Sequence, residues 1–398
     1  MEKKEPHTLF SRAEAAGYDP ATVARARFLV VGAGAIGSNT LQSLVLSGAS
    51  DVLVCDMDAA VERVNLPHSP LFRAPDVGRP KAEVAATRAA ACAPSGSCSA
   101  GYAVGRFESL GHGVLEGVAV VVAAVDSMEA RANIADATRR AQVPLIEAGF
   151  DGTRVHVTVW SNQTADGSCF RCLHGEAGHG RASCDLYATR MIAAGFLPAL
   201  QSAAATAGAL VAEAAIGAVH GRFPLDEHYL EIDVRTGHST RFRVSQRRHC
   251  PGAHRVLAPG QETGVDPSRN ARRLFQTGAV DIEERIVLPG PYLVAAPCCL
   301  CGCRVPMGVP HETAPEPDCR ACDGRACSEI ALVELAHEIG VGDEIAEHPL
   351  SRLGFGARDL VAVRAGETIR AIRLAGDGES AWQRVDADSA VTSDPDAA

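Results

Sequence analysis

The sequence has very little lysine and no stretch that resembles a targeting segment. Of its 38 basic residues only Lys3, Lys4 and Lys81 are lysines, and the other 35 are arginines. The net charge is −10 and no basic run offers a polyanion footprint, so we expect neither nucleic acid nor membrane as a partner. The N-terminus has no apolar run of the signal-peptide type. We therefore expect a cytoplasmic protein.

The chain does contain enough apolar sequence for a folded core. Of its 398 residues 46% are hydrophobic and 22% are charged, which is typical of a folded soluble protein. The length predicts roughly two to three domains. The most apolar long segment, 201–221, is rich in alanine and is interrupted by Glu213, so we interpret it as a buried helix rather than a membrane span.

Fourteen cysteines point to metal. In a reducing compartment, thiols at CxxC spacing are better explained as metal ligands than as disulfides. Cys169 and Cys172 form one such pair, and Cys250 with His254 can complete a tetrahedral zinc site that braces the fold. Unliganded structural cysteines are the alternative.

A second zinc site is predicted further along the chain. Two CxxC pairs separated by 17 residues form a strong zinc-knuckle spacing: Cys298, Cys301, Cys319 and Cys322. Three further thiols could exchange roles with them: Cys299, Cys303 and Cys327. This module could dock a partner protein, or simply stabilise a small domain.

A glycine-rich turn follows the first predicted strand. The segment FLVVGAGAIGS, residues 28–38, carries GxGxxG as Gly32, Gly34 and Gly37. Such glycines permit a tight turn, close approach of backbone to phosphate, and close packing of the following helix. Asp56 ends the next predicted strand, where a carboxylate can accept ribose hydroxyls. The motif fits NAD, FAD or ATP, and a purely structural turn is the alternative.

Three charged residues narrow the choice of nucleotide. Arg73 and Lys81 bring positive charge beside the turn, and a lone lysine in an arginine-dominated chain favours a site that needs a compact ammonium for phosphates. An exposed lysine at a helix start is the alternative. Asp126 ends the strand-like GVAVVVAAVD, at the edge where open α/β sheets bind ligands. It can hold Mg²⁺, cap the next helix, or do both.

The hydrophobic patterns predict an α/β fold with a Rossmann-like mixed sheet, because early parallel units give way to antiparallel strands. After a first strand–turn–helix–strand unit, further strands are expected at 118–125, 144–147, 154–160, 229–234 and 239–244, with helices near 81–92, 128–141 and 203–218. Beyond a cysteine-dense stretch we predict a helix over 328–338 and a hairpin that turns at Gly366 and Glu367.

Taken together, these motifs resemble the ThiF/MoeB/HesA family, the bacterial relatives of ubiquitin-activating enzymes. The resemblance runs from about Arg12 to His254, about 60% of the chain, and is carried by GAGAIGS, DMD, NLPHSPLFRAPDVGRPKA, AVDSMEAR, a CxxC and TAG. It implies an adenylyltransferase that uses ATP and Mg²⁺ to activate the C-terminal glycine carboxylate of a ubiquitin-like or sulfur-carrier protein. Pyrophosphate is released, and a conjugating enzyme is a possible further partner.

The resemblance also implies roles for individual residues. The glycine turn, Asp56 and Asp58 of the DMD motif would hold the nucleotide; Asn65, Arg73 and Lys81 would contact phosphates, and Asp126 the metal. Arg12 would reach across a homodimer, with an ordinary surface arginine as the alternative. Cys184 would accept the activated carboxyl as a thioester, with a core cysteine as the alternative. One departure is His68, which stands where the family usually has a phosphate-contacting arginine.

Composition and motif spacing, together with the extent of the resemblance, predict an organisation in four parts. An adenylation domain with its zinc site covers 1–257, a linker 258–275, a zinc-knuckle module 276–385 and a disordered tail 386–398. Two other functions compete with adenylation. A zinc-braced pseudoenzyme could scaffold a partner, an alternative motivated by His68 and by the long C-terminal extension. A nicotinamide dehydrogenase is disfavoured, because no hydride-transfer His/Lys pair follows Asp56 in a second domain.

Overall fold

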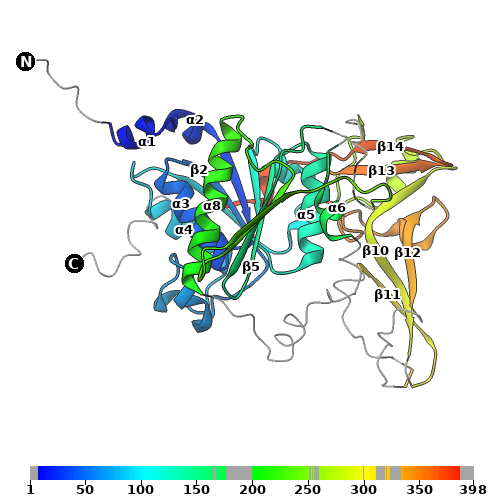
Figure 1. The fold of residues 1–398 in the computed structure, drawn as a ribbon. Helices are drawn as coiled ribbons and strands as arrows, with labels where there is room; N and C mark the ends of the chain where they lie inside the picture. The colour runs from blue at the N-terminus through cyan, green and yellow to red at the C-terminus, as the bar shows by residue number, and fades with distance from the viewer. Residues whose placement is uncertain are drawn as a thin grey trace, which may run out of the picture. The chain divides into compact units, whose positions relative to one another are not determined.

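The structure is a computed structural model (Figure 1). It describes residues 8–164, 167–175, 200–250, 252, 254, 260–298, 300–310, 319, 321–322 and 333–385. The chain forms two compact units. The first contains residues up to 107, residues 115–256 and the chain from 380 onward, and the second contains 108–114 and 257–379.

The first unit is built on a nine-stranded mixed sheet, which confirms the predicted fold class. Its strand order is β15-β3-β2-β1-β4-β5-β6-β7-β8. The parallel strands are β1 Arg27–Val31, β2 Asp51–Asp56, β3 Ser99–Val104, β4 Val120–Ala123 and β5 Leu145–Asp151. The antiparallel strands are β6 Arg154–Trp160, β7 His228–Asp233, β8 Ser239–Arg243 and β15 Gln383–Arg384. The central strands are almost wholly buried, as apolar runs covered on both faces should be.

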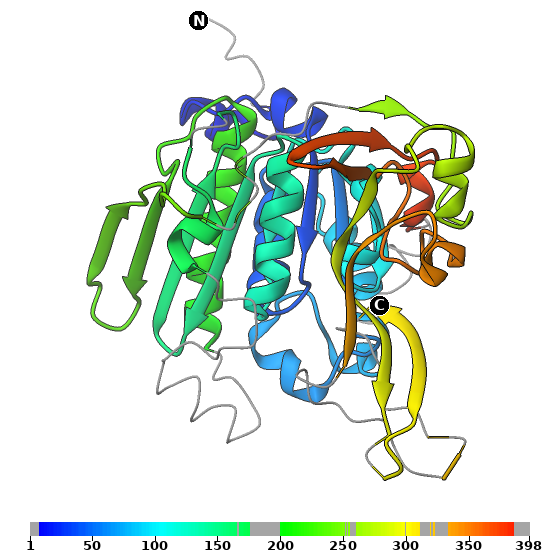
Figure 2. The same ribbon diagram turned by 90° about the vertical axis from the view of Figure 1, so that its right-hand side faces the viewer.

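Helices cover both faces of this sheet (Figure 1). One layer contains α3 Ala35–Leu46, α4 Lys81–Ala91 and α8 Gln201–Val219, and the other contains α5 Met128–Arg140 and α6 Phe170–His174, with α5 lying in front of the strands in Figure 2. Helix α8 is long and apolar enough to span a membrane by composition, but it packs on α3, β5 and β6. It is therefore the predicted buried helix. Near the N-terminus lie α1 Ser11–Ala15 and α2 Pro20–Arg25.

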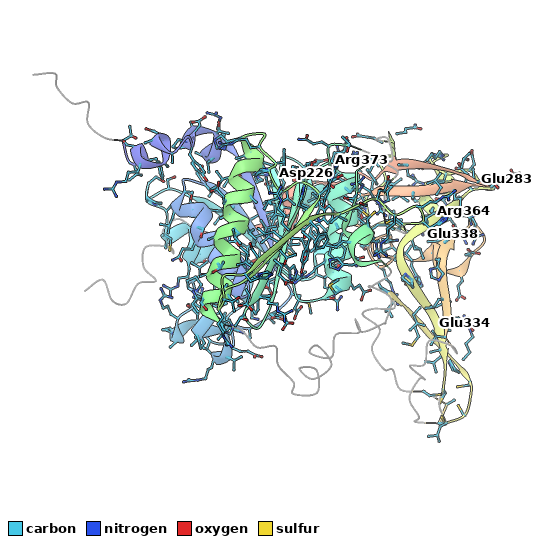
Figure 3. All side chains as sticks on the ribbon, in the orientation of Figure 1. Asp226, Glu283, Glu334, Glu338, Arg364 and Arg373 are labelled. Carbon is cyan, nitrogen blue, oxygen red and sulfur yellow. The ribbon has the colours of Figure 1, made fainter. Side chains whose placement is uncertain are left out.

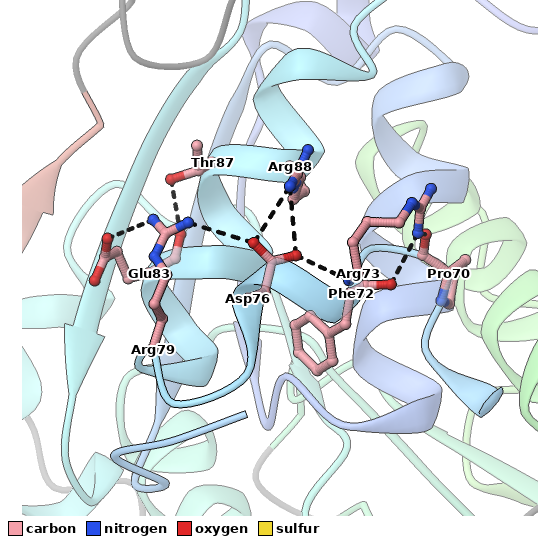
Figure 4. Close-up of polar contacts among 8 residues, drawn as sticks. All are labelled: Pro70, Phe72, Arg73, Asp76, Arg79, Glu83, Thr87 and Arg88. Atoms are coloured by element: carbon pink, nitrogen blue, oxygen red, sulfur yellow. Dashed lines mark hydrogen bonds and ion pairs between the residues drawn. The ribbon is translucent and has the colours of Figure 1, made fainter. Parts of the chain in front are cut away.

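Short 3-10 helices supply several connections: η1 Arg63–His68, η2 Ala74–Asp76, η3 Phe107–Ser109, η4 His112–Leu115, η7 Glu344–Glu347 and η8 Gly378–Ala381. The first two lie between β2 and α4, in the segment expected to contact phosphates. Asp76 fixes this segment, because it is buried and accepts hydrogen bonds from Arg79 and Arg88 (Figure 4). It also accepts one from the backbone N–H of Arg73, at 2.8 Å.

The second unit is organised around a long strand, β10 Arg285–Pro297. Its sheet has the order β11-β10-β13-β14-β9, with β12 also paired to β10. The remaining elements are β9 Gln261–Glu262, α9 Arg272–Gln276, β11 Arg304–Pro310, β12 Glu334–Ile339, β13 Leu360–Ala365 and β14 Thr368–Arg373. Strands β13 and β14 pair from Leu360–Arg373 to Ala365–Thr368, which confirms the predicted hairpin.

The helix predicted over 328–338 is wrong in its described part. Residues 334–339 form β12, antiparallel to β10, and 328–332 lie outside the described residues. Pairing with β10 overrides the local helical pattern, because each strand satisfies its backbone groups on the other. Side chains reinforce this arrangement: Glu338 of β12 accepts a 2.6 Å hydrogen bond from Arg364 of β13 (Figure 3).

The predicted linker over 258–275 is also structured where it is described. Val265, Leu274 and Phe275 are buried in the core of the second unit, and β9 pairs with β14. The polar residues of this segment therefore belong to loops of the second unit, which are anchored to its sheet and core. The boundaries differ as well, since segment 108–114 joins the second unit and β15 returns to the first. The tail predicted to be disordered, 386–398, lies outside the described residues.

Candidate functional site

The glycine turn connects β1 to α3. Gly32 has φ +94°, and a Cβ there would lie 2.4 Å from the carbonyl oxygen of Ala124. A Cβ on Gly37 would lie 1.8 Å from the carbonyl oxygen of Gly32, so the first turn of α3 packs directly on the loop. Gly34 is the N-cap of α3 and provides no side-chain cap. No side chain at the N-cap therefore bonds the first backbone amides of α3. An anion site at a helix start requires such free amides.

Asp56 ties the turn to the end of β2. Its Oδ2 accepts a 2.6 Å hydrogen bond from the amide of Ala33, and its Oδ1 accepts a 2.8 Å bond from the amide of Asp58. Burial raises the pKa of Asp56, although the two amides and Lys81 oppose the rise. The carboxylate therefore fixes the loop on which a nucleotide would sit, at the position where the sequence predicts a ribose contact.

Lys81, which is the only lysine beyond the first four residues, is the first residue of α4. Its Nζ donates to Oδ2 of Asp58 at 2.5 Å, and its side chain is only 11% exposed. The ammonium is thus held at the same edge of the sheet as the glycine turn. Burial and the charge of Lys81 together lower the pKa of His68. His68 is therefore neutral near pH 7, and it does not replace the positive charge of the arginine usual in the family.

Asn65 and Arg73 contact their own segment. Oδ1 of Asn65 accepts a 2.9 Å hydrogen bond from the amide of Glu62 at the start of η1. The exposed Arg73 donates from one guanidinium nitrogen to the carbonyls of Pro70, at 2.7 Å, and Phe72, at 2.9 Å (Figure 4). Arg73 would have to leave these two carbonyls to contact a phosphate.

Asp126 lies just beyond β4, at the same edge as Asp56. It is exposed, and we find no hydrogen bond or ion pair for it among the described residues. The next helix is capped by Ser127, whose Oγ accepts from the amide of Ala130 at 3.3 Å. Since Ser127 serves as the cap, the carboxylate of Asp126 is available for a cation.

Two further predicted residues are not brought to this edge by the described contacts. Arg12 lies in α1, exposed and with no contact found in the described part of the chain. A role across a dimer remains a prediction. Cys184 lies outside the described residues, so the structure does not place it.

A buried ionic cluster that no sequence motif indicates lies beside Asp126 in the structure. Arg131 of α5 donates to Oε1 of Glu147 on β5, and the same nitrogen lies 3.1 Å from Nε2 of His156 on β6. Glu147 is fully buried. Burial raises the pKa of Glu147, but Arg131 and His156 outweigh it and lower the pKa to about 2. Arg131 and Glu147 are 16 residues apart in the sequence, so no short motif indicates that they pair.

This lowered pKa predicts acid sensitivity. Stability contributed by ionised Glu147 is fully present above the unfolded-state pKa of 4.5 and is lost as the pH falls toward the folded-state pKa of about 2. The linked contribution is on the order of 3 kcal/mol. Denaturant unfolding between pH 5 and pH 2.5 should show a shallower loss of stability in Glu147→Gln than in wild type. Equal slopes would contradict this assignment.

The first cysteine cluster lies where α6 meets the chain after β8. The ligand atoms of Cys169, Cys172, Cys250 and His254 all lie within 4.8 Å of one another. The sulfurs of Cys169 and Cys172 are 3.8 Å apart, and Nε2 of His254 is 3.2 Å from Cys172 Sγ. Tetrahedral zinc with thiolates at ~2.3 Å requires sulfurs about 3.8 Å apart. The residues therefore fit zinc, as predicted.

The second cluster belongs to the second unit and brings together Cys298, Cys301, Cys319 and Cys322, again within 4.8 Å. Amides of Leu300 and Ala321 donate to the sulfurs of Cys298 and Cys319 at 3.4 Å, which supports thiolate ligands. A fifth thiol, Cys303, lies 3.2 Å from the sulfurs of both Cys301 and Cys319. Cys299 and Cys327 lie outside the described residues.

Two zinc ions per chain are expected by elemental analysis of the purified protein. Cys172→Ser and Cys298→Ser should each lose about one, because removing one ligand opens a closed tetrahedral site. Cys303→Ser is the matched control and should keep both. If Cys303→Ser loses one zinc while Cys301→Ser keeps two, Cys303 rather than Cys301 is the ligand.

The fold and site define a mixed α/β protein with a glycine turn, an acid–lysine pair and an exposed aspartate at one sheet edge. Residues 9–252 match the model of the ThiF family, and the chain belongs to that family. The predicted family is thereby confirmed.

Among relatives, the chain is 33% identical over 233 residues to the sulfur carrier protein adenylyltransferase of Thermus thermophilus, covering 57% of this chain and 82% of that protein. It is 34% identical over 154 residues to the SAMP-activating enzyme E1 of Haloferax volcanii, covering 38% and 54%. It is 39% identical over 144 residues to human ubiquitin-like modifier-activating enzyme 7, covering 34% and only 14%.

Solved structures support the fold. Escherichia coli MccB with AMPCPP and selenomethionine MccA superposes with a TM-score of 0.51 at 19% identity, covering 64% of this chain and 76% of that chain. MccB with ATP gives a TM-score of 0.50 at 18% identity, covering 63% and 75%. At this identity the likeness concerns the fold alone.

Proposed function

We propose that the protein is an ATP-dependent adenylyltransferase that activates the C-terminal carboxylate of a ubiquitin-like or sulfur-carrier protein. The observation that supports this most directly is the meeting, at one sheet edge, of the glycine turn, the Asp58–Lys81 pair and Asp126. Family membership and the names of the relatives favour a protein carboxylate as acceptor.

The residues divide the work of holding ATP. The amides of the glycine turn and Asp56 would hold the adenosine half, and Lys81 would leave Asp58 to bind phosphate oxygens. Mg²⁺ beside Asp126 would supply positive charge against the phosphates. The acceptor carboxylate attacks the α-phosphorus, a carboxyl–phosphate bond forms, and the bond to the β-phosphate breaks to release pyrophosphate. Positioning and charge suffice for this step, and no protein nucleophile is needed.

Three finer parts of the proposal rest on the family resemblance. A thioester on Cys184 would follow adenylation, Arg12 would complete the site across a homodimer, and a conjugating enzyme would receive the product. We also propose a cytoplasmic location.

ATP–pyrophosphate exchange with a carrier ending in Gly-Gly tests the proposed function. Lys81→Ala and Asp126→Ala should each lower exchange by roughly 10²–10³-fold, because each removes charge stabilisation in the transition state. Arg63→Ala, which removes an exposed cation from the neighbouring η1 helix, should leave exchange near wild type.

Two results would reject adenylation. ATP binding without exchange, insensitive to both substitutions, would favour the scaffold. Neutral His68 and the bonds of Arg73 to its own segment support that alternative. Turnover of NAD(H) would favour a dehydrogenase.

A further inference from the structure

The loop that carries Asp126 is held from behind by Arg131. The Nε of Arg131 donates a 2.7 Å hydrogen bond to the carbonyl of Val125, the residue directly before Asp126. We find no contact of the Asp126 side chain itself among the described residues. Within the described residues, the hydrogen bond from Arg131 to the Val125 carbonyl therefore restrains the backbone next to the exposed carboxylate of Asp126.

The orientation of Arg131 is set by two residues of the sheet. Its terminal nitrogen meets Oε1 of Glu147 and lies 3.1 Å from Nε2 of His156, while its Nε points to Val125. His156 is in turn stacked on Tyr229, with ring centres 5.6 Å apart. The guanidinium therefore spans from β5 and β6 to the loop after β4. Because the group is planar and rigid, holding its terminal nitrogen against Glu147 also sets the direction in which its Nε points toward Val125.

Gly149 makes room for this arrangement. It pairs with His156 across β5 and β6, and a Cβ there would lie 2.5 Å from the His156 ring and 2.7 Å from a guanidinium nitrogen of Arg131. No side chain fits at this position without displacing both residues. The sheet is thus shaped to admit the guanidinium of Arg131.

We propose that Glu147 is a positioning residue for Asp126, acting through Arg131 and the Val125 carbonyl. The inference rests on the proposed function, in which Asp126 holds Mg²⁺ against ATP. A ligating carboxylate needs partners behind it to keep its direction, and losing such partners typically lowers metal affinity ~10–100-fold. For Asp126 this partner is Arg131, which bonds the backbone carbonyl of the preceding residue, Val125, and not the carboxylate itself. The low pKa of Glu147 agrees with this role, since the carboxylate stays ionised against Arg131 near neutral pH.

Calorimetric titration of ATP into the full chain, with Mg²⁺ or with EDTA, tests the proposal. Wild type should gain affinity from Mg²⁺, and Asp126→Asn should lose that gain. Glu147→Gln should lose ~10-fold or more of the gain and bind ATP in EDTA like wild type, because the glycine turn and Lys81 are untouched. Asp126→Asn with Glu147→Gln should match Asp126→Asn alone, since both act on one ligand.

A second variant covers the chance that Glu147→Gln fails to fold, since it leaves a buried arginine unpaired. Arg131→Lys keeps a positive charge beside Glu147 but cannot span from Glu147 to the Val125 carbonyl, so it should lose the magnesium gain equally. The matched control is Asp51→Asn, which breaks the 2.8 Å Arg27–Asp51 pair at the opposite edge of the same sheet. It should keep the gain in full.

The outcomes separate the two proposals. If wild type binds Mg²⁺–ATP but folded Glu147→Gln or Arg131→Lys keeps the full magnesium gain, Glu147 does not position Asp126 and the proposed function stands. The inference is also overturned if Asp126→Asn with Glu147→Gln loses more affinity for Mg²⁺–ATP than Asp126→Asn alone, because the two residues would then act independently. If wild type itself shows no ATP binding, the proposed function fails and the inference fails with it.

Discussion

The parallel pairing of β1 with both β2 and β4 is the constraint on which the whole candidate site depends. Parallel strands end at the same edge of a sheet, so the residues that follow them meet there. The glycine turn follows β1, Asp56 ends β2, and Asp126 follows β4. The contact between Gly32 and the Ala124 carbonyl region exists only because β1 and β4 are neighbours. A single change of strand order would separate the glycine turn from both carboxylates.

Charge at this edge is distributed so that most groups already have partners. Lys81 is paired with Asp58, Arg73 with backbone carbonyls, and Asp56 with two amides. A triphosphate bound as proposed would have to compete with Asp58 for Lys81, and that exchange would favour a ligand carrying more negative charge than one carboxylate. Asp126 differs from these groups, because the hydrogen bond that holds it is made to the backbone of Val125 and not to its own side chain. An exposed carboxylate next to a held loop is suited to a cation that arrives with the nucleotide.

The parts of the molecule that could be predicted are those with local signals. Strand β6 was predicted with its observed bounds, because an alternating run between turns has one interpretation. The two clusters of potential zinc ligands were indicated by CxxC spacing, and the structure brings the members of each cluster together. The Arg131–Glu147 pair had no such signal, since it depends on the register of β5 beside β4. Strand β12 was mistaken for a helix because its partner, β10, decides its conformation and no short window contains both.

The two cysteine clusters serve different parts of the chain. The first joins Cys169 at the start of α6 to Cys250, 81 residues later, and so ties the chain after β8 back to the α5 side of the sheet. Because these ligands come together only in the folded chain, zinc bound there would add its binding free energy to folding. The second cluster joins residues about 20 apart within the second unit, beside β10 and β11. There the apolar cluster is small, and a bound metal would supply stability that burial does not. Zinc bound at either cluster would therefore brace the fold, while the proposed chemistry lies at the sheet edge.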